Sequence, residues 1–171
     1  MISRRFEHFL TGFELRSSGK WFLLSSLIGC VAGLGAILFQ ILTHTVVVWT
    51  LAYFANYIPG EAKGEPAEIE LEEGGFSPWM IVAVMTVGGL ASGVLVYSLA
   101  PEAEGHGTDA AIDAFHNKRG QINARTPIVK TIASAITLGT GGSGGREGPI
   151  AQIGAGFGSF LATKLGLSAR D

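Results

Sequence analysis

The sequence carries little charge. Asp, Glu, Lys and Arg make up only 15% of its 171 residues, whereas a soluble domain usually carries about 25%. Two stretches, residues 21–60 and 74–101, contain none of these four residue types. This pattern disfavours an ordinary water-soluble domain. It also excludes a disordered chain, because disorder requires low hydrophobicity and high net charge.

The sequence also has a single cysteine and no excess of basic residues. Cys30 is the single cysteine, so one chain can form neither a disulfide framework nor a thiolate metal site. The four histidines show no metal-ligand spacing, and we expect no metal and no cofactor. The net charge of −2 offers nothing to nucleic acid, which we do not expect as a partner. Glycine is abundant instead, at 25 residues, as is typical of closely packed membrane helices.

Both uncharged stretches are long enough to cross a bilayer, which takes about 20 apolar residues. The first contains WFLLSSLIGCVAGLGAILFQIL, and the following THTVVVWTLAYFANYI either extends the same helix or forms a second element. The second contains SPWMIVAVMTVGGLASGVLVYSLA, enough for one span. The first stretch exceeds the 7–15 apolar residues of a signal peptide and has no A-x-A site. The sequence therefore predicts an all-α integral membrane protein that contacts lipid.

The distribution of charge predicts an orientation. Basic residues precede the first span, and residues 116–125 carry three basic residues and no acid, whereas residues 61–73 carry six Glu and one Lys. By the positive-inside rule, the N-terminus and residues 116–125 lie in the cytoplasm, and the Glu-rich loop lies outside. Residues 1–20 place their apolar side chains on one helical face. They predict a cytoplasmic amphipathic helix, separate from a membrane domain over residues 21–171.

The second half of the chain has short, glycine-broken apolar segments. EGHGTDAAIDAF predicts a short helix that begins near Thr108, and TPIVKTIASAITL and PIAQIGAGFGSFLATKLGL flank the run GTGGSGGREG. Such segments are typical of broken membrane helices, whose non-helical ends meet at mid-membrane and form a substrate site. Two helix N-termini are expected, one after Gly105-His106-Gly107 and one after Arg146-Glu147-Gly148. A helix N-terminus attracts anions through its free N–H groups and its dipole.

Two charged side chains in this half have more than one interpretation. Glu147 lies in a glycine-rich break next to a helix start, where its carboxylate can compete with an anion for the same N–H groups until it is protonated. It can equally cap its own helix or pair with Arg146. Lys130 lies early in an apolar helix and either lines a cytoplasmic vestibule or extends to the interface.

The segment Gly145-Arg146-Glu147-Gly148-Pro149, continuing as IAQIGAGFGS, resembles the GREGP signature of the CLC chloride channels and chloride/proton exchangers. Gly105-His106-Gly107 lies where that family has its GSGIP anion-binding turn. The resemblance implies the first part of an inverted-repeat helical bundle, and not an enzyme. It also implies a homodimer and a second half of the fold that this chain lacks. It gives Glu147 the role of gating and proton-carrying group. The residues implied in anion binding are Gly105, His106, Gly107, Thr108, Arg146, Gly148 and Ile150.

The sequence departs from the family at the residues that correspond to the GSGIP turn. His106 stands at the family's serine, and Thr108 and Asp109 stand at its isoleucine and proline. Histidine also donates hydrogen bonds and becomes cationic at low pH. Asp109 either caps its own helix or disfavours an anion there. Chloride, nitrate and fluoride all remain candidate anions, carried by a channel or by a proton-coupled exchanger.

Two readings from other classes stand beside transport. One is a truncated membrane scaffold that packs against another chain without transporting. The other is a soluble dinucleotide enzyme, since Gly139–Gly144 satisfies G-x-G-x-x-G. The required βαβ unit and the following acid are missing, which makes that motif match uninformative.

Overall fold

The computed structural model describes residues 17–59 and 75–167. Within these ranges every regular element is a helix, which confirms the predicted all-α class. The predicted amphipathic helix falls on residues outside this description, except that residues 17–20 begin the first long helix. In chain order the elements are α2 (Ser17–Val47), η1 (Val48–Ala52), α3 (Tyr53–Ala55), α4 (Pro78–Leu99), η2 (Pro101–Ala103), α5 (Gly107–Asn117), α6 (Arg125–Gly139) and α7 (Glu147–Leu165).

The first apolar stretch forms one long helical run. From Gly19 to Ala55 it has 37 residues, or about 55 Å at 1.5 Å per residue. The π-helical turn η1 and the short α3 thus extend α2, which answers the question that the sequence left open. This length exceeds the roughly 30 Å of a bilayer's hydrocarbon core, so the helix must tilt to stay within it.

Helix α4 has 22 residues, the length of one crossing. Both α4 and the run Gly19–Ala55 are long and apolar enough to cross a membrane. In the most apolar part of each helix, only 6% of α4 and 11% of the run Gly19–Ala55 is buried inside the structure. Most of their large apolar side chains therefore face outward, as expected of helices surrounded by lipid or by further protein.

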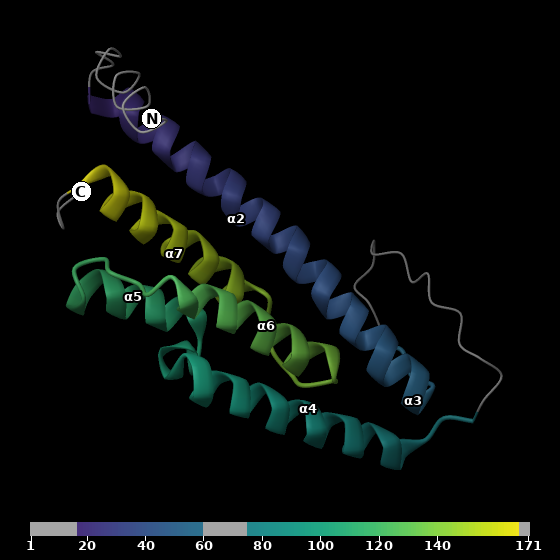
Figure 1. Cartoon of the computed structure of the whole chain (residues 1–171). Coiled ribbons are helices and arrows are strands. Elements are labelled where there is room, and N and C mark those ends of the chain that lie inside the picture. The colour runs from purple at the N-terminus through teal and green to yellow at the C-terminus, as the bar shows by residue number, and fades with distance from the viewer. Residues whose placement is uncertain (1–16, 60–74, 168–171) are drawn as a thin grey trace, which may run out of the picture.

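Helices α6 and α7 form the predicted broken pair. They have 15 and 19 residues, and they lie against successive parts of α2 (Figure 1). Gly139 at the end of α6 packs on Val46, whereas Ile153 near the start of α7 packs on Gly35, about half-way along the long run. Helix α7 thus begins beside the middle of α2 and runs back toward the start of α2 (Figure 1).

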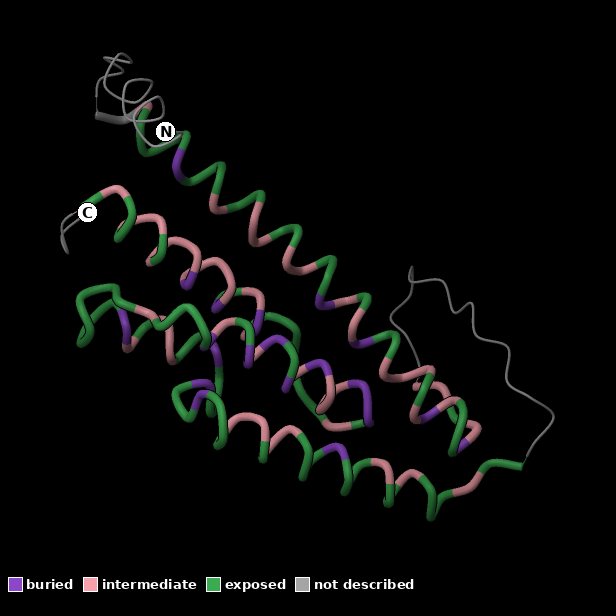
Figure 2. Tube along the Cα trace, in the orientation of Figure 1, coloured by how far each residue is buried: buried purple, intermediate pink, exposed green. Residues whose placement is uncertain are grey.

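The buried residues concentrate on α6, which is packed between α2 and α4 and also contacts α7 (Figure 2). Close helix contacts depend on small residues, as in other membrane proteins. Three glycine pairs have the small-xxx-small spacing that favours such contacts, namely Gly29/Gly33, Gly89/Gly93 and Gly154/Gly158. Gly154 and Gly158 do meet α2, at Ala32 and Ile28, but the pairs Gly29/Gly33 and Gly89/Gly93 face open space among the described residues.

A substitution at Gly88 tests the contact between α4 and α6. A methyl group there would overlap the Thr140 side chain, with the two Cβ atoms 2.6 Å apart. We expect Gly88→Ala to lower the free energy of unfolding by about 1–3 kcal/mol, as overpacking does. Thermal unfolding of the purified protein in detergent measures this loss. The neighbouring Gly89 has nothing within 4 Å, so Gly89→Ala serves as the control; equal stability of the two variants would contradict the packing described.

Candidate functional site

The first turn of α5 follows a tight bend at Gly105. This residue has φ of +74°, a conformation that glycine adopts without strain. His106 is extended at the N-cap position and makes no side-chain capping bond. The first hydrogen bond of the helix runs from the Ala110 amide to the His106 carbonyl, at 3.3 Å. Among the described residues, the amides of Gly107, Thr108 and Asp109 therefore donate to no acceptor.

The first turn of α7 has the same character. Arg146 occupies the N-cap position, and the helix begins at Glu147 itself. The Ile150 amide donates to the Arg146 carbonyl at 3.3 Å, while the amides of Glu147 and Gly148 donate to nothing in the described part of the chain. The exposed Glu147 side chain folds back over Gly145, close enough that a side chain on that glycine would overlap the carboxylate.

The two helix starts meet backbone to backbone. A Cβ atom on Gly107 would lie only 2.6 Å from the carbonyl carbon of Gly148, and one on Gly148 would lie 3.2 Å from the Gly107 nitrogen. Glycine at both positions therefore permits a contact that other residues would block. Gly107 and Gly148, about forty positions apart in the sequence, thus lie in direct contact.

A cavity of about 390 Å³ opens at this junction. It is lined mainly by glycines, hydroxyl side chains and three ionisable residues, which come from the starts of α5 and α7, the loops before them, and α6. The lining residues are Gly105, His106, Gly107, Thr108, Lys130, Ser134, Thr137, Leu138, Ser143, Gly144, Gly145, Glu147, Gly148 and Pro149. Free amides and positive helix ends that face a cavity of this size make it suitable for a small anion.

Most residues singled out from the sequence lie in this cavity, but two do not. Seven of them line it, namely Gly105, His106, Gly107, Thr108, Lys130, Glu147 and Gly148. Arg146 and Ile150 are not among the lining residues, and the Ile150 amide is already engaged by the Arg146 carbonyl. Pro149 lines the cavity but has no N–H to offer.

Lys130 supports the turn before α5. Its ammonium group donates to the Ala103 carbonyl at 3.0 Å and also to the Gly105 carbonyl. Its side chain therefore lines the cavity. Since carbonyl oxygens repel an anion, their pairing with a cation leaves the cavity more favourable to negative charge.

The sequence reasoning missed the hydroxyl residues of α6. Ser134 and Thr137 follow Lys130 at i+4 and i+7, so the three share one face of an otherwise apolar helix. All three line the cavity. A polar stripe of this spacing inside an apolar helix was visible in the sequence and would have predicted them.

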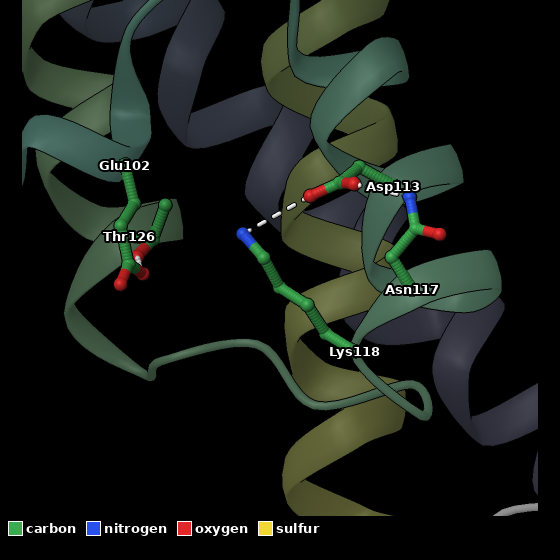
Figure 3. Close-up of polar contacts among 5 residues, drawn as sticks. All are labelled: Glu102, Asp113, Asn117, Lys118 and Thr126. Atoms are coloured by element: carbon green, nitrogen blue, oxygen red, sulfur yellow. Dashed lines mark hydrogen bonds and ion pairs between the residues drawn. The ribbon is translucent and has the colours of Figure 1, made fainter.

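A second, polar cavity of about 670 Å³ lies near the α5–α6 loop. At its edge, Asp113 accepts from Asn117 at 2.7 Å and pairs with Lys118 at 3.0 Å (Figure 3). These partners, Asn117 foremost, lower the pKa of Asp113. The pair therefore stabilises the end of α5 at neutral pH, and this contribution is lost as the pH falls through the lowered pKa. The pair is solvent-exposed, so it adds little.

Comparison with known proteins shows a similarity to one family over the second half of the chain. Residues 88–171 match the family model for voltage gated chloride channels. This region, which includes both helix starts and the cavity, is similar to the CLC family. At the level of the family these proteins transport chloride and are not enzymes.

Two curated relatives are named as chloride channel proteins. A ClcB-like protein of Ralstonia nicotianae is 28% identical over 142 residues, which cover 83% of this chain and 30% of the relative. The CLC-e protein of Arabidopsis thaliana is 29% identical over 146 residues, which cover 84% of this chain and 19% of the relative. The chain thus spans less than a third of either relative. No solved structure matches it.

Replacement of Lys130 tests whether its hydrogen bonds stabilise the turn before α5. Lys130→Met leaves the Ala103 and Gly105 carbonyls without their donor, and we expect the free energy of unfolding to fall by roughly 1–2 kcal/mol. Backbone amide exchange around residues 103–107 should rise at the same time. Lys130→Arg keeps the charge and donors and should behave more like the parent protein. Lys164→Met, an exposed change of the same kind, is the control; equal exchange in both methionine variants would contradict this role.

Proposed function

We propose that the protein carrying this chain moves chloride or a similar small anion across a membrane, through the cavity between α5 and α7. The observation that carries this proposal is the meeting of two helix N-termini, with unpaired amides, at one cavity. In a bilayer, free amides are tolerated only where they are buried in protein or line an aqueous space. The match of residues 88–171 to the family of voltage gated chloride channels supports the same conclusion.

Glu147 is the proposed gate. Its carboxylate lies at the start of α7 and lines the cavity, so it competes with an anion for the same positive helix ends. Protonation removes its charge and thereby removes the competition. One residue then controls anion access and carries protons, whether the complete protein is a channel or a proton-coupled exchanger.

The proposed orientation places the N-terminus and the α5–α6 loop in the cytoplasm. The start of α2, the α5–α6 loop and the end of α7 lie at one end of the structure (Figure 1). These segments carry most of the described basic residues, namely Lys20, Lys118, Arg119, Arg125 and Lys164. This clustering supports a cell-membrane protein with that end inside.

We also propose that further protein completes the pathway. The curated relatives are more than three times as long as the stretch that matches them. The outward faces of α2 and α4 are apolar and include the open glycines Gly29, Gly33 and Gly89. These faces suit lipid, the other half of an inverted repeat, or the second copy of a homodimer. The same faces support the second candidate function, a non-transporting scaffold that packs with another chain.

Substitution of Glu147 tests the gate. In the full-length protein reconstituted into liposomes, Glu147→Gln should abolish proton coupling or pH gating and leave chloride flux in place. A chloride electrode and a pH-sensitive dye report the two fluxes separately. Glu102→Gln removes the same charge in the other cavity and is the control. Unchanged pH dependence in Glu147→Gln would disprove the gate, and absence of any anion flux in the parent protein would favour the scaffold.

His106 should affect which anion is preferred. It lines the cavity in place of the family's serine, and its imidazole offers a bulkier donor that can also become charged. We expect His106→Ser to change the ratio of chloride to nitrate flux by about threefold or more, the scale of one modest hydrogen bond. His116→Ser, at the exposed end of α5, is the control. Identical flux ratios in the His106 variant and the parent would show that His106 does not contact the ion.

A further inference from the structure

A buried glutamine lies behind the cavity. Gln152, on α7, is only 1% exposed and is among the largest fully buried side chains, beside Phe39 and Leu51. Its Oε1 atom has no hydrogen-bond donor among the described residues. Buried side-chain oxygens in folded proteins almost always have a partner, so this orphan calls for an explanation.

The unpaired oxygen faces the start of α5. A Cβ atom on Gly107 would lie 3.1 Å from Gln152 Oε1. Gln152 follows Gly148 by four positions, and therefore lies on the same face of α7, one turn further along. Gly148 lines the cavity and Gln152 does not. The first residue of α5 thus lines the cavity and also lies next to the carboxamide of Gln152.

The unpaired acceptor lies beside unpaired donors. The amides of Gly107, Thr108 and Asp109 donate to nothing in the described structure. A buried acceptor and nearby free donors are each more stable when they bond to one another. An anion in the cavity would attract the same amides.

We propose that Gln152 is a positioning residue that competes with the anion for the first-turn amides of α5. Without an anion, a small movement of the carboxamide toward this turn lets Oε1 accept a hydrogen bond from it, which holds the N-terminus of α5 against α7. When an anion enters, the amides turn to it and release the carboxamide. Gln152 therefore sets the affinity of the anion site from inside the protein. This inference rests on the proposed anion transport and adds a control of that site distinct from Glu147.

Two substitutions of Gln152 should shift affinity in opposite directions. Gln152→Met keeps the length and cannot compete for an amide, so chloride should bind about tenfold more tightly. Gln152→Glu places a negative charge beside the same amides, so chloride should bind about tenfold or more weakly. Isothermal titration of chloride into the purified full-length protein, in gluconate buffer, measures both. A merely structural role would weaken binding in both variants, and that result would overturn the inference.

Gln121 provides matched controls. It is exposed and lines the other cavity, so Gln121→Met and Gln121→Glu should leave the dissociation constant unchanged. Gln152→Asn covers the risk that a buried methionine prevents folding. It stays polar but withdraws the oxygen by one methylene, and it should tighten chloride binding as methionine does. Unchanged affinity in Gln152→Asn would count against the inference.

Amide hydrogen exchange separates this inference from the proposed function. Without chloride, amides 107–109 should exchange several times faster in Gln152→Met than in the parent protein, since their internal acceptor is gone. Equal exchange would overturn the inference, even in a protein that binds chloride. If the parent protein binds neither chloride nor nitrate, but exchange of its amides 107–109 still depends on Gln152, the proposed function is refuted. The contact between Gln152 and the start of α5 is then retained.

Discussion

The close approach of two backbones at Gly107 and Gly148 is the constraint on which the site depends. A side chain at either position would separate the first turns of α5 and α7. The free amides would then no longer face one cavity, and Gln152 would no longer reach the start of α5. Glycine costs up to about 1 kcal/mol inside a helix, but at these helix starts it permits a contact that no other residue allows.

The surrounding helices make this junction tolerable in a membrane. Helix α7 begins about half-way along α2, so its unpaired amides lie beside the middle of the long helix rather than beside its ends. The run Gly19–Ala55 and α4 supply long apolar walls, and α6 fills the space between them. Lys130 pairs with the carbonyls that would otherwise oppose an anion. Each feature leaves the site less negative or less open to lipid.

Two acceptors border the same pair of helix starts from different sides. Glu147 reaches the cavity from the start of α7, and its charge depends on protonation. Gln152 reaches the start of α5 from within the protein, and it stays neutral at every pH. A site arranged in this way can separate its response to protons, through Glu147, from its intrinsic affinity, through Gln152.

The sequence alone determined the spans and the helix starts. Uncharged stretches of sufficient length predicted the long run and α4, and glycine and proline predicted the breaks before α5 and α7, because these are local properties of the chain. Only the tertiary structure decided which segments meet. It brought Gly107 to Gly148, turned Ser134 and Thr137 toward the cavity and left Gly29 and Gly33 without a neighbour. It also placed Gln152 behind α5, a role that nothing in its local sequence reveals. The physical reason is that such contacts depend on how α6 packs between α2 and α4, which no local pattern encodes.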